Sequence, residues 1–232
     1  MIISKMLLNP QEAVHGGSYR SAPALSGRSV YDGHQALWAA FSDGPDRRRD
    51  FLYREIAPNA FLAVSVRPPV SAPPLWKVQS KVYDPQLRVG ERLHFSLRVN
   101  PVRKTRDGDG RQVRHDVVQH ARTEWKKAHG KDSRDMPSRM DFARQTGWDW
   151  LAARAAALGL ALGADDEALF AVERYEPCVF YKKGAGKVTV TQLDMTGFAT
   201  VADPDALKVA LFQGVGCAKG FGCGLLLIQR AR

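Results

Sequence analysis

A glycine-rich segment near the C-terminus carries the clearest chemical signal in this sequence. Between Gly214 and Gly224 there are five glycines in eleven residues, and one lysine, Lys219, lies among them. Exposed backbone N–H groups beside a cation suit a phosphate, so the segment predicts a phosphate contact. It fits neither common nucleotide motif, because no Ser or Thr follows Lys219 and because an apolar strand, rather than a helix, comes next. The glycines could instead allow close backbone packing between the last helix and the last strand.

Tyr31 and His34 are the second set of residues that could do chemistry. The apolar residues from Val30 to Phe41 recur at helical spacing, which predicts a helix over about residues 29–41. At about 100° per residue, His34 falls on the apolar face of this helix and Tyr31 at its edge. One interpretation is a partly buried histidine bonded to a neighbour. The other is a Tyr–His pair, three residues apart and so on one face, that meets at a cleft.

Two basic clusters make a polyanion the first partner to consider, since the formal net charge is +10. One cluster surrounds a turn-forming Asp-Gly-Asp-Gly sequence and contains Arg103, Lys104, Arg106, Arg111 and Arg114. The other is expected at the tip of a hairpin between two strands and contains Lys182, Lys183 and Lys187. Either cluster could be a solvated turn without a partner. If they contact RNA phosphates instead, affinity will depend strongly on salt.

The other reactive side chains predict neither a metal site nor a cofactor. The sequence from Asp107 begins like a calcium loop, but Val118 stands at its twelfth position, where glutamate is needed. The three cysteines, Cys178, Cys217 and Cys223, lack zinc-ligand spacing, and their odd number argues against a disulfide framework. His115 and His120 lie in the basic segment, where a role on RNA or no role is expected. We therefore predict a reaction without metal.

The sequence also predicts a cytoplasmic protein. Few cysteines fit a reducing compartment. The first ten residues are too short and too quickly interrupted for a signal peptide. No apolar run approaches the roughly 20 residues that a membrane span needs, so we expect no membrane association.

The elements that must position these residues form the same pattern twice. The first half predicts a helix at 29–41 and strands at 2–8, 51–56, 61–66 and 76–82. The second half predicts helices at about 139–158 and 203–213 and strands at 93–99, 169–181, 187–200 and 225–229. The order β-α-β-β-α-β is the ferredoxin-like arrangement, although the first half lacks a good second helix. We predict an α+β fold of two tandem ferredoxin-like (RRM-like) domains, residues 1–90 and 91–232, whose sheet faces can bind single-stranded RNA.

Five segments, spread over almost the whole chain, share their residues and their order with one protein family. They are Ile3-Ser4-Lys5, Tyr31-x-x-His34-Gln35-x-Leu37-Trp38-x-x-Phe41, Arg49-Asp50-Phe51-Leu52-Tyr53, Phe95-x-Leu97-Arg98-x-Asn100-Pro101 and Gly214-x-Gly216-x-Ala218-Lys219-x-x-Gly222-Cys223-Gly224-Leu225-Leu226. Together they resemble the CasE (Cse3) family, the CRISPR RNA-processing endoribonucleases of type I-E systems. The glycine-rich tail alone occurs across a wider superfamily, whereas the combination is more specific.

The resemblance implies a tandem ferredoxin-like fold and a metal-independent cut at the base of the stem-loop of CRISPR repeat RNA. It assigns catalysis to Tyr31 and His34. The RNA's own 2′-hydroxyl would attack the adjacent phosphate and leave a 2′,3′-cyclic phosphate. His34, with an imidazole pKa near about 6.5, would protonate the departing 5′-oxygen, and Tyr31 would orient or activate the 2′-hydroxyl. A lysine that the sequence does not identify would stabilise the developing phosphorane charge.

The resemblance also implies RNA contacts and partners. The hairpin with Lys182, Lys183 and Lys187 would enter the major groove of the stem. The other predicted RNA-binding cations are Arg103, Lys104, Arg111, Arg114 and Lys219. The protein would keep its product as a subunit of the Cascade complex. Two alternatives stay open: a subunit that binds the RNA hairpin without cutting it, which the presence of Tyr31 and His34 disfavours, and a pair of RRM-like binding domains, which lack an aromatic RNP motif here.

Overall fold

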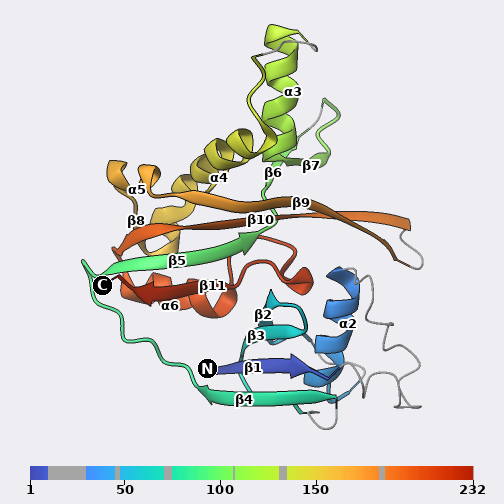
Figure 1. Ribbon diagram of the computed structural model, residues 1–232, viewed down its shortest axis with the longest axis vertical. Helices are drawn as coiled ribbons and strands as arrows, with labels where there is room; N and C mark the ends of the chain where they lie inside the picture. Colours follow the sequence, from blue (N-terminus) through green and yellow to red (C-terminus); the bar gives the residue numbers. More distant parts are fainter. Residues whose placement is uncertain are drawn as a thin grey trace. The chain divides into compact units, whose positions relative to one another are not determined.

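The computed structural model describes residues 1–9, 30–44, 48–70, 75–106, 108–130, 135–182 and 186–231, with the backbone alone at 30–35 and at residue 182 (Figure 1). The chain forms two compact units, each built from separate stretches of sequence. Unit 1 contains Met1–Gln86, Cys178–Val190 and Phe212–Leu225. Unit 2 contains Leu87–Pro177, Thr191–Leu211 and Leu226–Arg232. Unit 2 thus begins close to the predicted boundary, but two later stretches belong to unit 1. The division at residue 90 stays a prediction.

The sheet of unit 1 has four antiparallel strands in the order β2-β3-β1-β4. These strands are β1 (Ile2–Leu8), β2 (Phe51–Ala57), β3 (Ala60–Ser65) and β4 (Trp76–Val82), and helix α2 (Val30–Phe41) follows β1. Because β3 lies between β1 and β2, the arrangement is a split βαβ unit. The described residues between β3 and β4, 66–70 and 75, contain no helix, as the proline-rich sequence predicted.

The core of unit 1 fixes the second half of α2 against the sheet. Leu37 and Phe41, four positions apart and so on one helical face, are fully buried. The Phe41 ring stacks on Phe51 of β2 with 4.3 Å between ring centroids and an angle of 15°. Met6 of β1 and Phe61 of β3 complete the same cluster. This packing sets the direction of the helix that carries positions 31 and 34.

Unit 2 repeats the pattern. Its sheet has the order β11-β5-β10, with both β8 and β9 paired to β10, and its strands are β5 (Arg92–Val99), β8 (Leu160–Ala161), β9 (Ala171–Lys182), β10 (Gly186–Val201) and β11 (Leu226–Arg230). The helices are α4 (Arg139–Ala155), the short α5 (Ala164–Ala168) and α6 (Pro204–Gln213). Asp203 caps α6 as predicted, since its Oδ1 accepts from the N–H groups of Asp205 and Ala206, both at 3.0 Å. The predicted α+β fold of two ferredoxin-like patterns is confirmed.

A buried ion pair links two central strands of this sheet. Arg98 of β5 and Asp194 of β10 are cross-strand partners, and Nε and Nη2 of Arg98 donate to the two carboxylate oxygens at 2.6 and 2.9 Å. Both residues are buried, and Arg174 of β9 adds a third bond to the same carboxylate at 3.2 Å. Because every oxygen of the carboxylate is bonded, the charges are tolerated inside the sheet. Arg98 therefore has a structural role.

An insertion between β5 and α4 accounts for the basic segment of the sequence. It contains β6 (Val102–Arg106), β7 (Gln112–Asp116) and α3 (Val117–His129), and it lies beyond the end of β5, with α3 in contact with α4 (Figure 1). Asp116 caps α3 by accepting from the N–H groups of Val118 and Gln119, and it also accepts from the hydroxyl of Tyr175 at 2.9 Å. Burial and the Asp116 carboxylate raise the pKa of Tyr175. The phenol thus stays protonated and anchors the insertion to β9.

Among the residues described, no helix is both long enough and apolar enough to cross a membrane.

Candidate functional site

The glycine-rich stretch, residues 214–224 and called the glycine segment below, is a closed and packed part of unit 1. The N–H of Val215 donates to the carbonyl of Gly224 at 2.8 Å, which brings the two ends together. Between them, Lys219–Phe221 form a short 3-10 turn, η2. The hydroxyl of Tyr53, on β2, donates to the carbonyl of Gly220 at 2.9 Å. The segment is therefore built against the sheet rather than left as an open loop.

Two of its glycines are required by close contacts. Gly224 has a φ of +89°, and a Cβ there would lie 2.8 Å from the carbonyl oxygen of Val215. Gly214 has a φ of +76°, and a Cβ there would lie 2.8 Å from Cδ2 of Leu52 on β2. At both positions the left-handed backbone and the lack of room for a Cβ disfavour any residue other than glycine. The packing interpretation of the glycines thus describes these two positions.

Lys219 lies on η2, where its side chain is half-buried and its ammonium group already makes one hydrogen bond. Its Nζ donates to the carbonyl of Gln213 at 2.7 Å, at the C-terminus of α6, where a cation is favourable. An ammonium has three donors, so two remain for another ligand. Partial burial lowers the pKa of Lys219, and the nearby Arg49 lowers it further. Partial burial likewise lowers the pKa of Arg49, which Tyr53 opposes.

The charge of Arg49 thus disfavours the protonated form of Lys219. Within the described part of the chain, no carboxylate pairs with either. A bound anion would relieve the repulsion between them, because an opposite charge nearby favours the protonated form of each. The electrostatics of this place favour a phosphate group.

The glycine segment also contacts the helix that was predicted to carry the chemistry. The turn η2 touches both α2 and β2. Positions 31 and 34 lie in the first half of α2, and the helix predicted for them is confirmed. The side chains of Tyr31 and His34 lie outside the described part of the structure, so their pairing at a cleft stays a prediction.

The C-terminal end of β9 and the N-terminal end of β10 pack on the glycine segment. Phe180 of β9 and Phe221 of η2 have ring centroids 5.0 Å apart, and Val190 of β10 and Cys223 share their cluster. Lys187 is exposed on β10. It directly precedes the partly buried Val188, so the two side chains point to opposite faces of the strand. Lys183 and the side chain of Lys182 lie outside the described residues. The backbone around the predicted basic hairpin therefore belongs to the same unit as α2 and Lys219.

The other basic cluster lies in unit 2 and is divided between two faces. In the β6–β7 pair, Arg103 stands opposite His115, and Lys104 stands opposite Arg114. Successive residues of a strand point to opposite faces, so Arg103 and Lys104 do not share a surface. Arg111 is exposed beyond the end of β6, 4.0 Å from Asp109. The sequence placed these cations in one cluster, and the formation of strand β6 separates them because its side chains alternate between two faces.

Comparisons with known proteins agree with this architecture. The model of a family described as "CRISPR associated protein" matches residues 1–230. Over 205 residues the chain is 31% identical to the CRISPR system Cascade subunit CasE of Escherichia coli K12, covering 86% of this chain and 91% of that one. The chain belongs to the CasE (Cse3) family.

Solved structures with the same fold include members named Cse3 and Cas6e. A CRISPR endoribonuclease Cse3 bound to a 19-nucleotide RNA matches with a TM-score of 0.67 at 22% identity, over 99% of this chain and 100% of that one. Thermus thermophilus Cse3, bound to an RNA that represents a pre-cleavage complex, matches with a TM-score of 0.65 at 22% identity, over 98% of both chains. Cas6e of E. coli K-12 matches with a TM-score of 0.57 at 24% identity, over the full length of both.

Arg49 is a candidate residue that the sequence did not single out, because it stood there only as part of a family segment. A signal was present, since Arg49 comes two residues before the buried strand β2. This strand contacts η2, the turn that carries Lys219. No three His, Cys, Asp or Glu side chains gather as metal ligands among the described residues.

Proposed function

We propose that this protein is a metal-independent endoribonuclease that cuts the stem-loop of CRISPR repeat RNA. The observation that carries the proposal is the position of the glycine segment. It contacts α2, holds Lys219 near Arg49 and packs on the ends of β9 and β10. The helix of Tyr31 and His34, a pair of cations and a basic strand end thus belong to one unit. The names of relatives, a Cascade subunit and a CRISPR endoribonuclease bound to RNA, supply the substrate class.

In the proposed reaction, the 2′-oxygen of the RNA attacks the adjacent phosphorus, and its proton passes to solvent water as the new bond forms. The bond from phosphorus to the 5′-oxygen breaks, and His34 gives this oxygen a proton. The products are a 2′,3′-cyclic phosphate and a 5′-hydroxyl. An imidazole suits the acid role because its pKa, about 6.5, lies near neutrality. Tyr31 orients the 2′-hydroxyl, since a phenol with a pKa of about 10 is a weak base at neutral pH.

Lys219 and Arg49 are proposed to stabilise the charge that develops on the phosphorane. Lys219 is held by its bond to Gln213 and keeps two donors for phosphate oxygens. Charge placed in advance is effective because no reorganisation is needed during the reaction. This assigns to Lys219 the cation that the sequence alone did not identify.

The remaining predicted cations are proposed to hold the RNA. In unit 1 these are Lys182, Lys183 and Lys187, at the ends of β9 and β10. In unit 2 they are Arg103, Lys104, Arg111 and Arg114, on the β6–β7 pair. We further propose that the protein keeps its product within the Cascade complex, in the cytoplasm, and needs no cofactor.

The test is cleavage of the cognate repeat RNA in EDTA by the wild type, His34→Ala and His129→Ala. His129 is exposed at the end of α3 and serves as the matched control. We expect His34→Ala to bind the RNA but to cut at least about a hundredfold more slowly, and His129→Ala to cut normally. Mass spectrometry should find a cyclic phosphate on the 5′ product.

Undiminished cutting by His34→Ala would remove this residue from the mechanism. A requirement for Mg²⁺ would contradict the metal-free reaction. A wild type that binds the stem-loop tightly and never cuts it would instead support the non-catalytic hairpin-binding subunit.

A further inference from the structure

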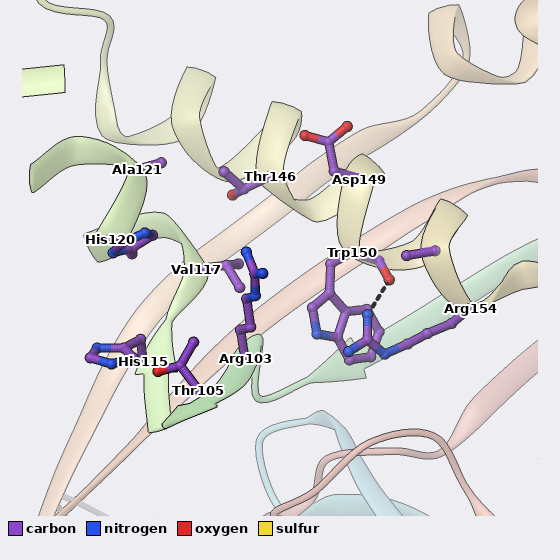
Figure 2. Close-up of a pocket in the computed structure, with 11 residues that line it drawn as sticks. Arg103, Thr105, His115, Val117, His120, Ala121, Thr146, Asp149, Trp150 and Arg154 are labelled. Carbon is purple, nitrogen blue, oxygen red and sulfur yellow. Dashed lines mark hydrogen bonds between the residues drawn. The ribbon is translucent and has the colours of Figure 1, made fainter. Parts of the chain in front are cut away.

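Unit 2 contains a cavity of about 500 Å³ that the proposed reaction does not use (Figure 2). The β6–β7 pair, the first turns of α3 and the second half of α4 line it. Its volume falls within the range of about 300–1,000 Å³ that is usual for small-ligand sites. The walls of the cavity differ in chemistry, and this difference limits what can fill it.

One wall is cationic and open to solvent. Arg103 of β6 and His115 of β7 are cross-strand partners, and the His115 ring lies 5.9 Å from the ring of His120 on α3. Figure 2 shows Arg103 extending into the space between these histidines and α4. All three side chains are exposed, and no carboxylate of the described residues pairs with Arg103. Such a group of donors suits a phosphate.

The opposite wall, on α4, combines an aromatic ring with a guanidinium group. The guanidinium of Arg154 lies 4.0 Å from the ring centroid of Trp150, and its Nη1 donates to the Trp150 carbonyl at 2.7 Å. Trp150 is buried, and both residues line the cavity (Figure 2). Layered aromatic and guanidinium planes are surfaces on which unpaired bases stack. Asp149 also lines the cavity, and its Oδ1 accepts from the side-chain amide of Gln145 at 3.4 Å.

We propose that this cavity holds one unpaired nucleotide of an RNA chain. Its phosphate contacts Arg103, His115 and His120, and its base lies against Trp150 and Arg154. Neither a bare anion nor an apolar peptide would satisfy both walls. The outer face of the same strand pair carries the exposed Lys104 and Arg114, so cations continue around the β6–β7 pair. That continuity favours a polyanionic strand over a free mononucleotide, and taking RNA as the strand rests on the proposed function.

The test uses a matched pair of substitutions on α4. Ala152 and Ala153 are neighbouring, exposed alanines, and only Ala153 lines the cavity. Ala153→Phe should fill the cavity, whereas Ala152→Phe should leave it empty. The probes are a labelled single-stranded RNA decanucleotide and a blunt repeat stem-loop without overhangs. We expect Ala153→Phe to weaken decanucleotide binding about tenfold, as loss of one stacked base does, and Ala152→Phe to change it less than twofold.

Neither substitution should alter binding of the blunt stem-loop, which reports on the proposed function by itself. A second pair keeps the test independent of a folding defect: Arg103→Gln should weaken binding of the decanucleotide more than binding of the stem-loop, whereas Lys104→Gln should weaken both alike.

The cavity proposal is overturned if the wild type does not bind the decanucleotide, or if Ala153→Phe binds it as tightly. It is also overturned if Ala153→Phe binds both RNAs normally but fails to assemble with other Cascade subunits, because the cavity would then take a protein. If the wild type binds the decanucleotide but not the stem-loop, the proposed function fails, and the Ala153→Phe result still decides the cavity.

Discussion

The glycine segment and the insertion at 102–129 both carry cations that the sequence predicts to contact RNA, yet they hold these cations in opposite ways. In the glycine segment, Lys219 is half-buried, bonded to Gln213 and close to Arg49. In the insertion, Arg103, Lys104 and Arg114 are exposed on the two faces of a strand pair. The first arrangement fixes one charge in place, and the second distributes many.

The difference has a physical consequence. Removing a cation from water is costly, so a half-buried cation such as Lys219 is expected where position matters more than number. Charge near a reacting phosphate has this requirement. Exposed cations along a polyanion act mainly by displacing its counterions, so their number matters more than their exact place. The glycine segment thus resembles catalytic machinery and the insertion a binding surface.

The largest effect is expected when the packing of the glycine segment is disturbed. Gly224→Ala should lower the free energy of unfolding by about 3 kcal/mol, because a left-handed backbone and a steric clash with Val215 add together. Gly90→Ala is the matched control, since Gly90 has a φ of +81° with no atom near its Cβ position. It should cost only about 1 kcal/mol. Urea unfolding measures both, and equal losses would show that the segment is not tightly packed.

The next largest effect is expected from the charge of Lys219. Lys219→Met should slow single-turnover cleavage about a hundredfold, the usual loss when one donor to a developing anion is removed. Lys219→Arg should retain most activity because it keeps the charge. A rate for Lys219→Met within a factor of two of the wild type would make Lys219 a helix cap only.

The same pair of variants gives the pH dependence. Because the pKa of Lys219 is below that of a free lysine, its proton is lost at a lower pH. The wild type should therefore lose activity relative to Lys219→Arg as pH rises from neutrality towards the ordinary lysine pKa of about 10.4. A constant ratio of the two rates over this interval would contradict the shift.

Removing one hydrogen bond of the glycine segment should have a smaller effect on stability. Tyr53→Phe deletes the donor to the carbonyl of Gly220, and we expect a loss of about 1 kcal/mol in the free energy of unfolding. Tyr181 is 76% exposed, so Tyr181→Phe is a control that should change stability by less than about 0.5 kcal/mol. Thermal unfolding followed by circular dichroism distinguishes the two.

The smallest effect on stability is expected in the insertion. Lys104→Ala combined with Arg114→Ala should change the free energy of unfolding by less than about 0.5 kcal/mol, since both side chains are exposed. RNA affinity should fall, and the slope of log affinity against log salt should decrease by roughly two, one for each lost phosphate contact. An unchanged slope would show that this face does not meet RNA.

Much of the fold could be predicted because it depends on local patterns. The alternation along β5, the helical spacing of α2 and the Asp203 cap of α6 are each visible within a few residues. The insertion was less accessible. Its two strands have only five residues each, and its sequence is highly charged, so the sequence indicated only a basic segment between β5 and α4. The cavity against Trp150 could not be foreseen, because it needs α3, α4 and the strand pair together.

The amino-acid sequence by itself determined the two ferredoxin-like patterns, the membership of the CasE family and the types of residue available for chemistry, because periodicity and motifs are properties of short stretches. Which of these stretches meet depends on the tertiary structure. Tyr53 and Gly220 are 167 positions apart, yet one hydrogen bond joins them and helps to place Lys219 beside the helix of His34. Such contacts arise from long-range packing, which no local pattern encodes.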